Sequence, residues 1–298
     1  MYKKSKLKSA TRPRFSPLTV AMLVILLIYA VSLFTLLAWG VLTAFKSQEE
    51  FRLSTFGFPK EWVWNFSYVF EQFFLPVVSE SGTTYVGLPM MFLYSILYAL
   101  GCAFFNTLVP CLTSYVCARY RFRFLKMFHT IVIIVMVVPI VGSLPSEIQM
   151  AQRFGLYDQI WGLWIMKANF LGMYFLVFYA MFKALPQAYT EAAKIDGAGN
   201  FSVMVRIALP LVRNTFLTVM LINFITFWND YQTPLIFLRS YPTVAYGVYS
   251  LANTNVNGMS YVPYRITAAV LMLVPTIILF LCFQKRLLGN LTIGGIKG

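Results

Sequence analysis

Long runs of apolar residues recur along this chain, and short polar segments separate them. A helix that crosses a bilayer needs about 20 predominantly apolar residues, because each residue advances the helix by about 1.5 Å. Six segments meet or approach this length, so the pattern predicts an all-α membrane protein with six transmembrane helices. The predicted spans are Leu18–Phe45, Pro89–Ala118, Phe128–Gln149, Ile160–Phe182, Asn214–Ile236 and Tyr264–Phe283.

Some residues inside these runs modify the prediction. Pro110, Pro139 and Pro275 fall within predicted spans and predict kinks, which neighbouring helices tolerate in a membrane bundle. Lys167 lies in the fourth run, where its side chain can extend to the interface. The first run follows a basic segment, as in a secretory signal peptide. It is longer than the apolar part of such a peptide and no cleavage site follows, so we expect a retained helix.

Composition supports a membrane environment. Apolar residues make up 59% of the 298 residues and charged residues 11%, whereas soluble domains carry about 25% charged residues. The net charge of +14 could also suit a nucleic-acid-binding protein. The basic residues do not form a stripe with interleaved aromatic residues, so we expect no nucleic-acid partner.

The basic residues predict the orientation of the spans. Most of the 24 lysines and arginines lie before the first run, after the sixth, and in the second-to-third and fourth-to-fifth connections. Cytoplasmic segments carry such an excess. We therefore expect a multi-pass protein of a prokaryotic inner membrane with both termini in the cytoplasm.

The same pattern divides the chain into segments. We expect a basic cytoplasmic N-terminus (1–17), a transmembrane domain (18–283) and a cytoplasmic tail (284–298). Within the domain, a long first external loop (46–88) is rich in aromatic residues, which predicts a small folded cap because disordered segments are poor in them. The fourth-to-fifth connection (183–213) is a long cytoplasmic loop.

The loop 183–213 predicts a helix, a tight turn and a second helix. Ala188, Ala192 and Ile195 share one helical face, and the small alanines leave room for a partner. Gly197 and Gly199 end the first helix, because glycine adopts the left-handed conformation at low cost. Asn200 is positioned to cap a second helix, which we expect to cover Phe201–Leu209 and to stop at Pro210.

The residues of this loop resemble the EAA loop of ATP-binding-cassette importer permeases. The resemblance rests on Glu-Ala-Ala at 191–193, Asp-Gly-Ala at 196–198, and Ile207 and Leu-Pro-Leu at 209–211. Similar segments lie at 155–157, 161–163, 228–230 and 234–235, and the C-terminal residues 291–298 resemble the carbohydrate subfamily. Met204 and Asn214 depart mildly from the family pattern, and the segment Phe73–Leu88 is longer than usual.

This resemblance implies the partners and the mechanism. Two permease subunits form the pathway, the second being a paralogue rather than a copy. Two ATPase subunits bind ATP and magnesium, an external solute-binding protein delivers the substrate, and the EAA helix docks on an ATPase. The coupling residues implied are Glu191, Ala192, Ala193, Asp196, Gly197, Ala198, Ile207 and Pro210.

Polar residues within the predicted spans are candidates for the substrate pathway. Asp230 is an acidic residue within a predicted span, and such a group is a functional candidate by default. The alternative is that it caps a kink near Pro234 and fixes packing. Carbohydrates need aromatic faces and hydrogen-bonding groups in an apolar channel. The candidates are Trp228, Asn229, Asp230, Tyr231, Asn223 and Asn106.

The sequence offers little for catalysis. It contains no Gly-Lys dipeptide, which excludes a Walker motif, and its single histidine, His129, excludes a two-histidine zinc helix. We expect no enzyme activity, metal or cofactor in this chain. The leading hypothesis is a carbohydrate importer subunit. The alternatives are a permease for another organic solute and a self-sufficient secondary transporter, which would usually show internal repeats.

Overall fold

The computed structural model describes residues 16–79, 82–120, 122–138, 142–253 and 258–291, with the backbone alone for 285–291. Within this part of the chain the protein is mostly helical. Four of the described helices are long and apolar enough to cross a membrane: Pro17–Thr43, Leu88–Arg119, Asn200–Trp228 and Val262–Gln284. The predictions made for residues 1–15, Arg121, Pro139 and 292–298 fall outside the described residues.

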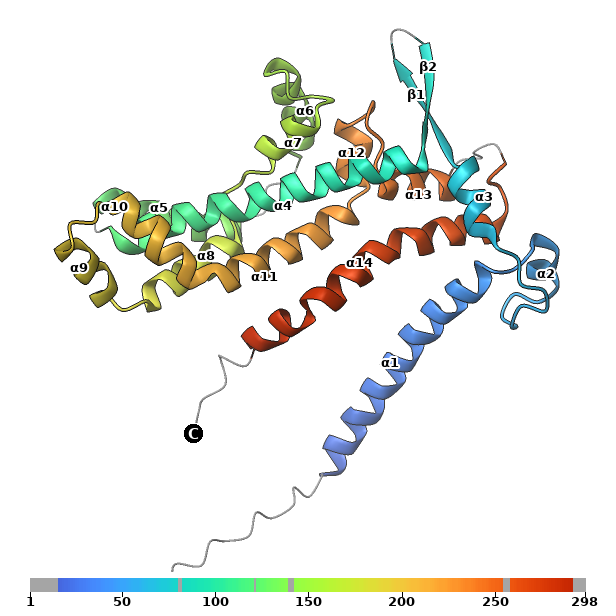
Figure 1. The fold of residues 1–298 in the computed structure, drawn as a ribbon, viewed down its shortest axis with the longest axis horizontal. Helices are drawn as coiled ribbons and strands as arrows, with labels where there is room; N and C mark the ends of the chain where they lie inside the picture. The colour runs from blue at the N-terminus through green and yellow to red at the C-terminus, as the bar shows by residue number, and fades with distance from the viewer. Residues whose placement is uncertain (1–15, 80–81, 121, 139–141, 254–257, 292–298) are drawn as a thin grey trace, which may run out of the picture.

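Three helices form the centre of the bundle (Figure 1). α4 (Leu88–Arg119) lies beside α11 (Leu209–Trp228) and α8 (Met173–Ala184). Ala99, Cys102 and Ala103 of α4 are fully buried. Small residues at such an interface let helix backbones approach closely, which drives association where both helices already lie in an apolar medium.

The predicted third and fourth spans are not single helices, so the prediction of uninterrupted spans is wrong there. The third run divides into α5 (Arg123–Val137) and α6 (Leu144–Arg153), and the fourth into α7 (Ile160–Met166) and α8. A glycine with positive φ lies in each break, Gly142 at 81° and Gly172 at 152°. These backbone angles are incompatible with a helix and are accessible to glycine.

The predicted fifth span is displaced along the sequence. The helix ends at Trp228 rather than Ile236, and a short helix, α12 (Gln232–Phe237), follows. At the other end α10 (Asn200–Val203) and a π-helical turn (Met204–Ala208) run directly into α11. The span is therefore continuous with the second helix of the loop 183–213.

A small cap folds at one end of the bundle and includes a β-hairpin, so the all-α prediction is wrong for this segment. The cap contains α2 (Gln48–Leu53), α3 (Asn65–Gln72), β1 (Phe74–Ser79), β2 (Gly82–Gly87) and α13 (Val244–Asn253). The two strands are antiparallel with Leu75 opposite Val86. Leu75 and Val77 are buried, whereas Val78 is 78% exposed, as period-two alternation requires.

Lys46 and Asn65 hold the cap to the end of α1 (Pro17–Thr43). The buried Lys46 donates from Nζ to the carbonyl of Ser54 at 2.7 Å. Asn65 donates from Nδ2 to the carbonyls of Ala44 and Lys46 at 2.9 and 2.8 Å. The predicted folded cap is thus present, and buried polar side chains determine its position by pairing with backbone groups.

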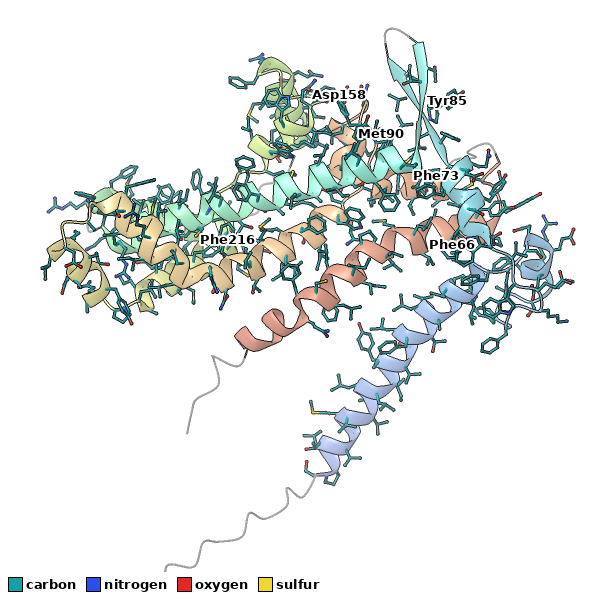
Figure 2. All side chains as sticks on the ribbon, in the orientation of Figure 1. Phe66, Phe73, Tyr85, Met90, Asp158 and Phe216 are labelled. Carbon is teal, nitrogen blue, oxygen red and sulfur yellow. The ribbon has the colours of Figure 1, made fainter. Side chains whose placement is uncertain are left out.

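Two further helices flank the central bundle. α14 (Val262–Leu291) packs beside α11, and α1 approaches α14 only near the cap. The apolar window of α1 is 0% buried, and Figure 2 shows its side chains projecting on every side. A helix with apolar residues all round is stable in lipid or against another protein, not in water.

Candidate coupling site and pathway residues

The loop between α8 and α11 forms α9 (Ala188–Ile195), at the end of the bundle opposite the cap (Figure 1). Ala198 donates its backbone N–H to the carbonyl of Ala193 at 2.9 Å, and Gly197 donates to Lys194 at 3.1 Å. This pair of bonds is a Schellman motif, which requires a left-handed residue after the helix. Gly197 supplies it with φ of 80°, and no atom lies within 4 Å of a Cβ built there. Backbone conformation, not crowding, therefore requires glycine.

The predicted partner-facing side of α9 is exposed in the single chain. Glu191, Ala192 and Asp196 are exposed, as are Ala188 and Ile195, while Ala193 is buried against the protein. Apolar side chains gather around this face, with Tyr189 53%, Ile195 87% and Phe201 75% exposed. Exposed apolar clusters of this kind mark interaction surfaces in segments outside the membrane.

α9 is attached to the bundle at both ends. Arg119, the last residue of α4, donates from Nη2 to the carbonyl of Leu185 at 3.2 Å, just before α9. After α9, Ala208 is buried in a hydrophobic cluster contributed by α4, α8 and α11. Ile207 is half-buried beside it. The segment around α9 is therefore attached to three helices of the bundle.

The second helix of the loop does not stop at Pro210, contrary to the prediction. Pro210 lies in the first turn of α11, and the π-helical turn precedes it. A proline inside an α-helix clashes with the carbonyl four residues earlier. The π turn avoids this by bonding Leu209 N–H to Met204 O, five residues back. Asn200 is also not the cap: Gly199 occupies that position, without a side-chain bond.

Asn106 and Asn223 join α4 to α11 within the bundle. Asn223 is 3% exposed and donates from Nδ2 to the Thr107 hydroxyl at 3.0 Å. Its Oδ1 accepts from Nδ2 of Asn106 at 3.3 Å. Both amides thus have partners within the chain, and interhelical hydrogen bonds of this type contribute to packing in membranes. They remain candidates for the pathway, with a structural role in addition.

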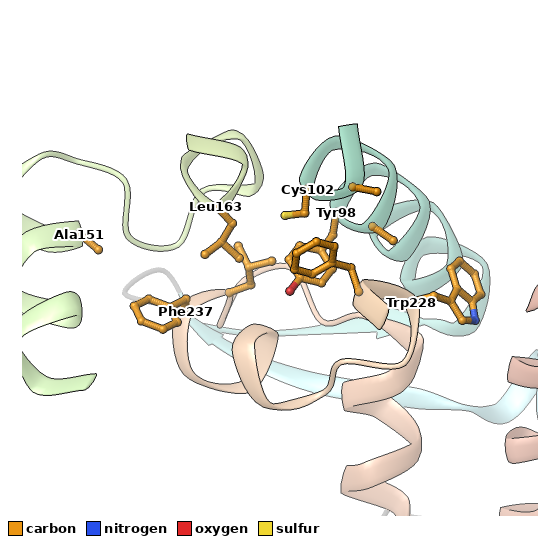
Figure 3. Packing of buried hydrophobic residues seen from close by; sticks show 10 residues of the cluster. Tyr98, Cys102, Ala151, Leu163, Trp228 and Phe237 are labelled. Carbon is orange, nitrogen blue, oxygen red and sulfur yellow. The ribbon is translucent and has the colours of Figure 1, made fainter. Parts of the chain in front are cut away.

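Asp230 caps α12 and pairs with α4. Its Oδ1 accepts from the backbone N–H of Thr233 at 3.0 Å, and its Oδ2 accepts from the Tyr98 hydroxyl at 2.9 Å. Trp228 is 2% exposed and donates from Nε1 to the carbonyl of Met272 in α14 at 3.0 Å. Figure 3 shows Tyr98 and Trp228 within one hydrophobic cluster. These contacts match the capping alternative for Asp230 and leave a pathway role untested.

Asn229 and Tyr231 are the predicted pathway residues that the chain leaves exposed. Tyr231 stacks on Tyr249 of α13, with ring centroids 4.2 Å apart and planes at 11°. No sequence pattern pairs these tyrosines, because they lie in different segments of the chain. A pair of parallel aromatic rings beside an exposed amide is the kind of surface that binds a sugar ring.

Asp158 anchors the segment between α6 and α7, a role that no pattern in the sequence indicated. Its Oδ2 accepts from the Ser240 hydroxyl at 2.6 Å and its Oδ1 from the Ser240 N–H at 2.9 Å. Its own N–H donates to the carbonyl of Phe237 at 2.9 Å. Figure 2 labels Asp158 beside α6 and α7. Its φ of 56° is an additional signal, because aspartate tolerates this region better than most residues.

Comparison with known proteins agrees with these features. Residues 111–291 match the family described as "Binding-protein-dependent transport system inner membrane component". The chain is 25% identical to the diacetylchitobiose uptake system permease protein of Streptomyces coelicolor (strain ATCC BAA-471 / A3(2) / M145), over 95% of this chain and 90% of that protein. It is 30% identical to the maltodextrin transport system permease protein of Bacillus subtilis (strain 168), over 68% and 74%.

A solved structure has the same fold. It is a chain of a bacterial ABC transporter involved in the import of the acidic polysaccharide alginate, with a TM-score of 0.73 and 20% identity. The alignment covers 92% of this chain and 99% of that one. The family match spans α9 together with α8 and α11 on either side of it, so this chain belongs to the family of inner-membrane components of binding-protein-dependent transport systems.

Proposed function

We propose that this chain is one of two membrane-spanning subunits of an ATP-driven importer for a carbohydrate, specifically an oligosaccharide. The relatives named above are permeases for diacetylchitobiose and for maltodextrin. The exposed tyrosine pair Tyr231–Tyr249 beside Asn229 offers this substrate class an aromatic face and an amide. The chain itself forms part of the pathway and leaves ATP and magnesium to its partners.

The membrane arrangement in this proposal has six crossings and both termini in the cytoplasm. Four crossings are the long helices, and the other two are α5 and α8, which have 15 and 12 residues. At about 1.5 Å per residue these two span less than the roughly 30 Å hydrocarbon core, so flanking segments complete each crossing. The cap then lies outside the cell and α9 in the cytoplasm.

The observation that carries the proposal is the surface of α9. A capped helix with exposed apolar neighbours stands at the end of the bundle opposite the cap and is tied to three central helices. We propose that it docks on one of two partner ATPases, with Glu191 and Gly197 as the coupling residues. Closure of the ATPases would tilt α9 and switch the bundle between two packings, as rigid-body transitions do.

A reconstituted system tests this function. The chain is purified with its second permease and ATPases, placed in liposomes with the cognate solute-binding protein, and supplied with radiolabelled oligosaccharide. We expect uptake that requires internal ATP and every subunit. Uptake by this chain alone, driven by an ion gradient, would contradict the proposal and favour a secondary transporter.

A charge reversal tests the docking surface. Glu191→Lys should lower uptake by roughly tenfold or more, because reversing a charge at an interface costs several kcal/mol. Glu71→Lys is a matched control, since Glu71 is an exposed glutamate of α3 in the cap. Both variants should insert normally into the membrane. The amount of ATPase subunit that co-purifies with the chain should fall for Glu191→Lys alone. Equal uptake and ATPase recovery for the two variants would exclude α9 as the docking element.

A further inference from the structure

A cationic cavity lies beside the attachment of α9. It has a volume of about 340 Å³ and is lined by the end of α4, the start of α5 and the end of α8. Arg119, Lys126 and Lys183 line it, one from each helix, and none of the described lining residues is a carboxylate. The volume lies within the range of roughly 300–1,000 Å³ that is typical of ligand sites. Three cations around one hollow attract an anion, even though Lys126 and Lys183 are exposed.

The side chains of the cavity are held in place. Lys183 Nζ lies over the ring of Tyr179, 5.6 Å from its centroid. The ring of His129 also contacts Tyr179, with the two ring centroids 4.4 Å apart. Arg119 is oriented by its bond to Leu185 O, and its Nε is buried without a hydrogen-bond partner among the described residues. Buried guanidinium nitrogens normally have acceptors. An anion would supply the acceptor that the chain does not.

The start of α5 adds to the preference of the cavity for an anion. The helix begins at Arg123 with no side-chain cap and no acidic residue in its first turn. Unpaired N–H groups and the helix dipole favour an anion at this end. Leu125 and Lys126 line the cavity, so the start of α5 lies beside it.

An apolar groove continues from the cavity between α4 and α5. Its volume is about 250 Å³, and Cys117 and Leu125 line both hollows. The rest of the groove is almost entirely hydrocarbon, from Leu112, Val116, Phe124 and Phe128. A soluble phosphorylated compound would use the cavity and leave the groove empty. An amphiphile with an anionic head would fill both.

We propose that the cavity and the groove together bind an anionic phospholipid, with its phosphate among Arg119, Lys126 and Lys183 and an acyl chain along the groove. The proposal rests on the membrane insertion described above, which places this end of α4 at the bilayer surface. Basic pockets between helices on the cytoplasmic side suit such head groups. An acidic face of a partner ATPase would match the charges but not the groove.

Photocrosslinking tests the site without using transport. The purified assembly of permeases and ATPases is incubated in detergent with phosphatidylglycerol that carries a photoreactive acyl chain, and the lipid bound to this chain is measured. The double variant Lys126→Gln and Lys183→Gln should lose roughly tenfold or more, since each basic residue near the head group contributes about fivefold. The control, Arg206→Gln and Arg213→Gln, removes two exposed charges outside the cavity and should change little.

Two further measurements identify the ligand. Val116→Trp keeps the charges but obstructs the groove, so it should lower crosslinking several-fold, and Lys126→Arg with Lys183→Arg should retain it in a folded protein. Crosslinks should map to the segment 112–128. The proposal is overturned if Val116→Trp has no effect while glycerol phosphate displaces the lipid, which indicates a soluble anion. It is also overturned if binding occurs only without the ATPases, which indicates that a partner chain occupies the cavity.

Discussion

In the cap and in the connection between α6 and α7, side chains bond to groups that lie far away in the sequence, whereas around α9, at the coupling end opposite the cap, most hydrogen bonds are local. Asp158 reaches Ser240, and Tyr157 donates to the carbonyl of Ile236 at 3.1 Å. Around α9 the bonds are those of a helix end, with Arg119–Leu185 as the long-range link. The cap end is thus stabilised within the chain, and the coupling end leaves its surface for a partner.

This difference has a mechanical consequence. In the proposed mechanism α9 must be stiff along its own length and attached to the helices that it moves. The Schellman motif and the buried Ala208 fit these two requirements. It must also expose the surface on which it is pushed, which Tyr189 and Phe201 do. In the same proposal, the opposite end opens and closes the pathway. Many long-range hydrogen bonds suit that end, because a packed interface with two discrete arrangements responds to small displacements.

The largest expected effect comes from breaking the coupling end. Gly197→Pro is incompatible with φ of 80° and removes the N–H that donates to Lys194. We expect uptake to fall at least tenfold with normal insertion, because proline fixes φ near −65° and its misplacement costs about 3 kcal/mol or more. The control is Gly199→Ala, since Gly199 has φ of −68° and open space at its Cβ. Comparable uptake by the two variants would contradict the motif.

A smaller effect is expected from breaking the cap end. Asp158→Ala removes the acceptors of Ser240 and leaves alanine at φ of 56°. Hydrogen bonds to a charged group contribute about 1.5–3 kcal/mol each. Because both bonds are only partly buried, we expect a loss at the lower end of their sum, about 3–4 kcal/mol, in the free energy of unfolding. Thermal unfolding of the purified assembly in detergent measures it.

Asp158→Asn is the matched variant for this prediction. It keeps one acceptor and tolerates the positive φ, so it should lose less than half as much stability as Asp158→Ala. ATPase recovery should stay unchanged for both, because the site is remote from α9. If less ATPase subunit co-purified while the free energy of unfolding stayed unchanged, the Asp158 site and the docking surface of α9 would not be independent.

The smallest expected effect lies between the two ends. Asn223→Ala leaves the Thr107 hydroxyl and the Asn106 amide without this partner, and such bonds in membranes contribute about 0.6–1.7 kcal/mol. Thr226→Ala is the control, since its hydroxyl donates to Ile222 O of its own helix. The dependence of uptake on sugar concentration, measured beside thermal stability, separates the roles: a structural amide changes stability, while a pathway amide changes the apparent affinity for the sugar.

The sequence predicted the features that depend on neighbouring residues. Gly197 was expected to end a helix near residue 197 because the preference of glycine for positive φ is local, and α9 ends at Ile195. The exposure of the face carrying Ala192 and Ile195 followed from helical spacing alone. The folded cap followed from its aromatic content, although its hairpin was not expected, because aromatic content does not indicate how Leu75 pairs with Val86.

Other features were beyond local reasoning. Pro210 looked like a helix end, and the π turn that accommodates it depends on packing of Ala208 and Val212 against α4 and α8. Gly172 did not stand out within an apolar run, so the break before α8 was not expected. The sequence left two interpretations of Asp230 open, a pathway residue and a cap. It did not indicate its hydrogen bond with the Tyr98 hydroxyl, because Tyr98 lies on another helix.

The sequence by itself determined that the chain is a helical membrane protein with a polar helix–turn–helix segment at one end of its bundle, because run length, charge placement and glycine conformation are properties of nearby residues. Only the tertiary structure decided which polar groups pair, where the spans break, and that three cations from three helices surround one hollow. These outcomes depend on contacts between residues far apart in the chain, and a linear pattern does not record them.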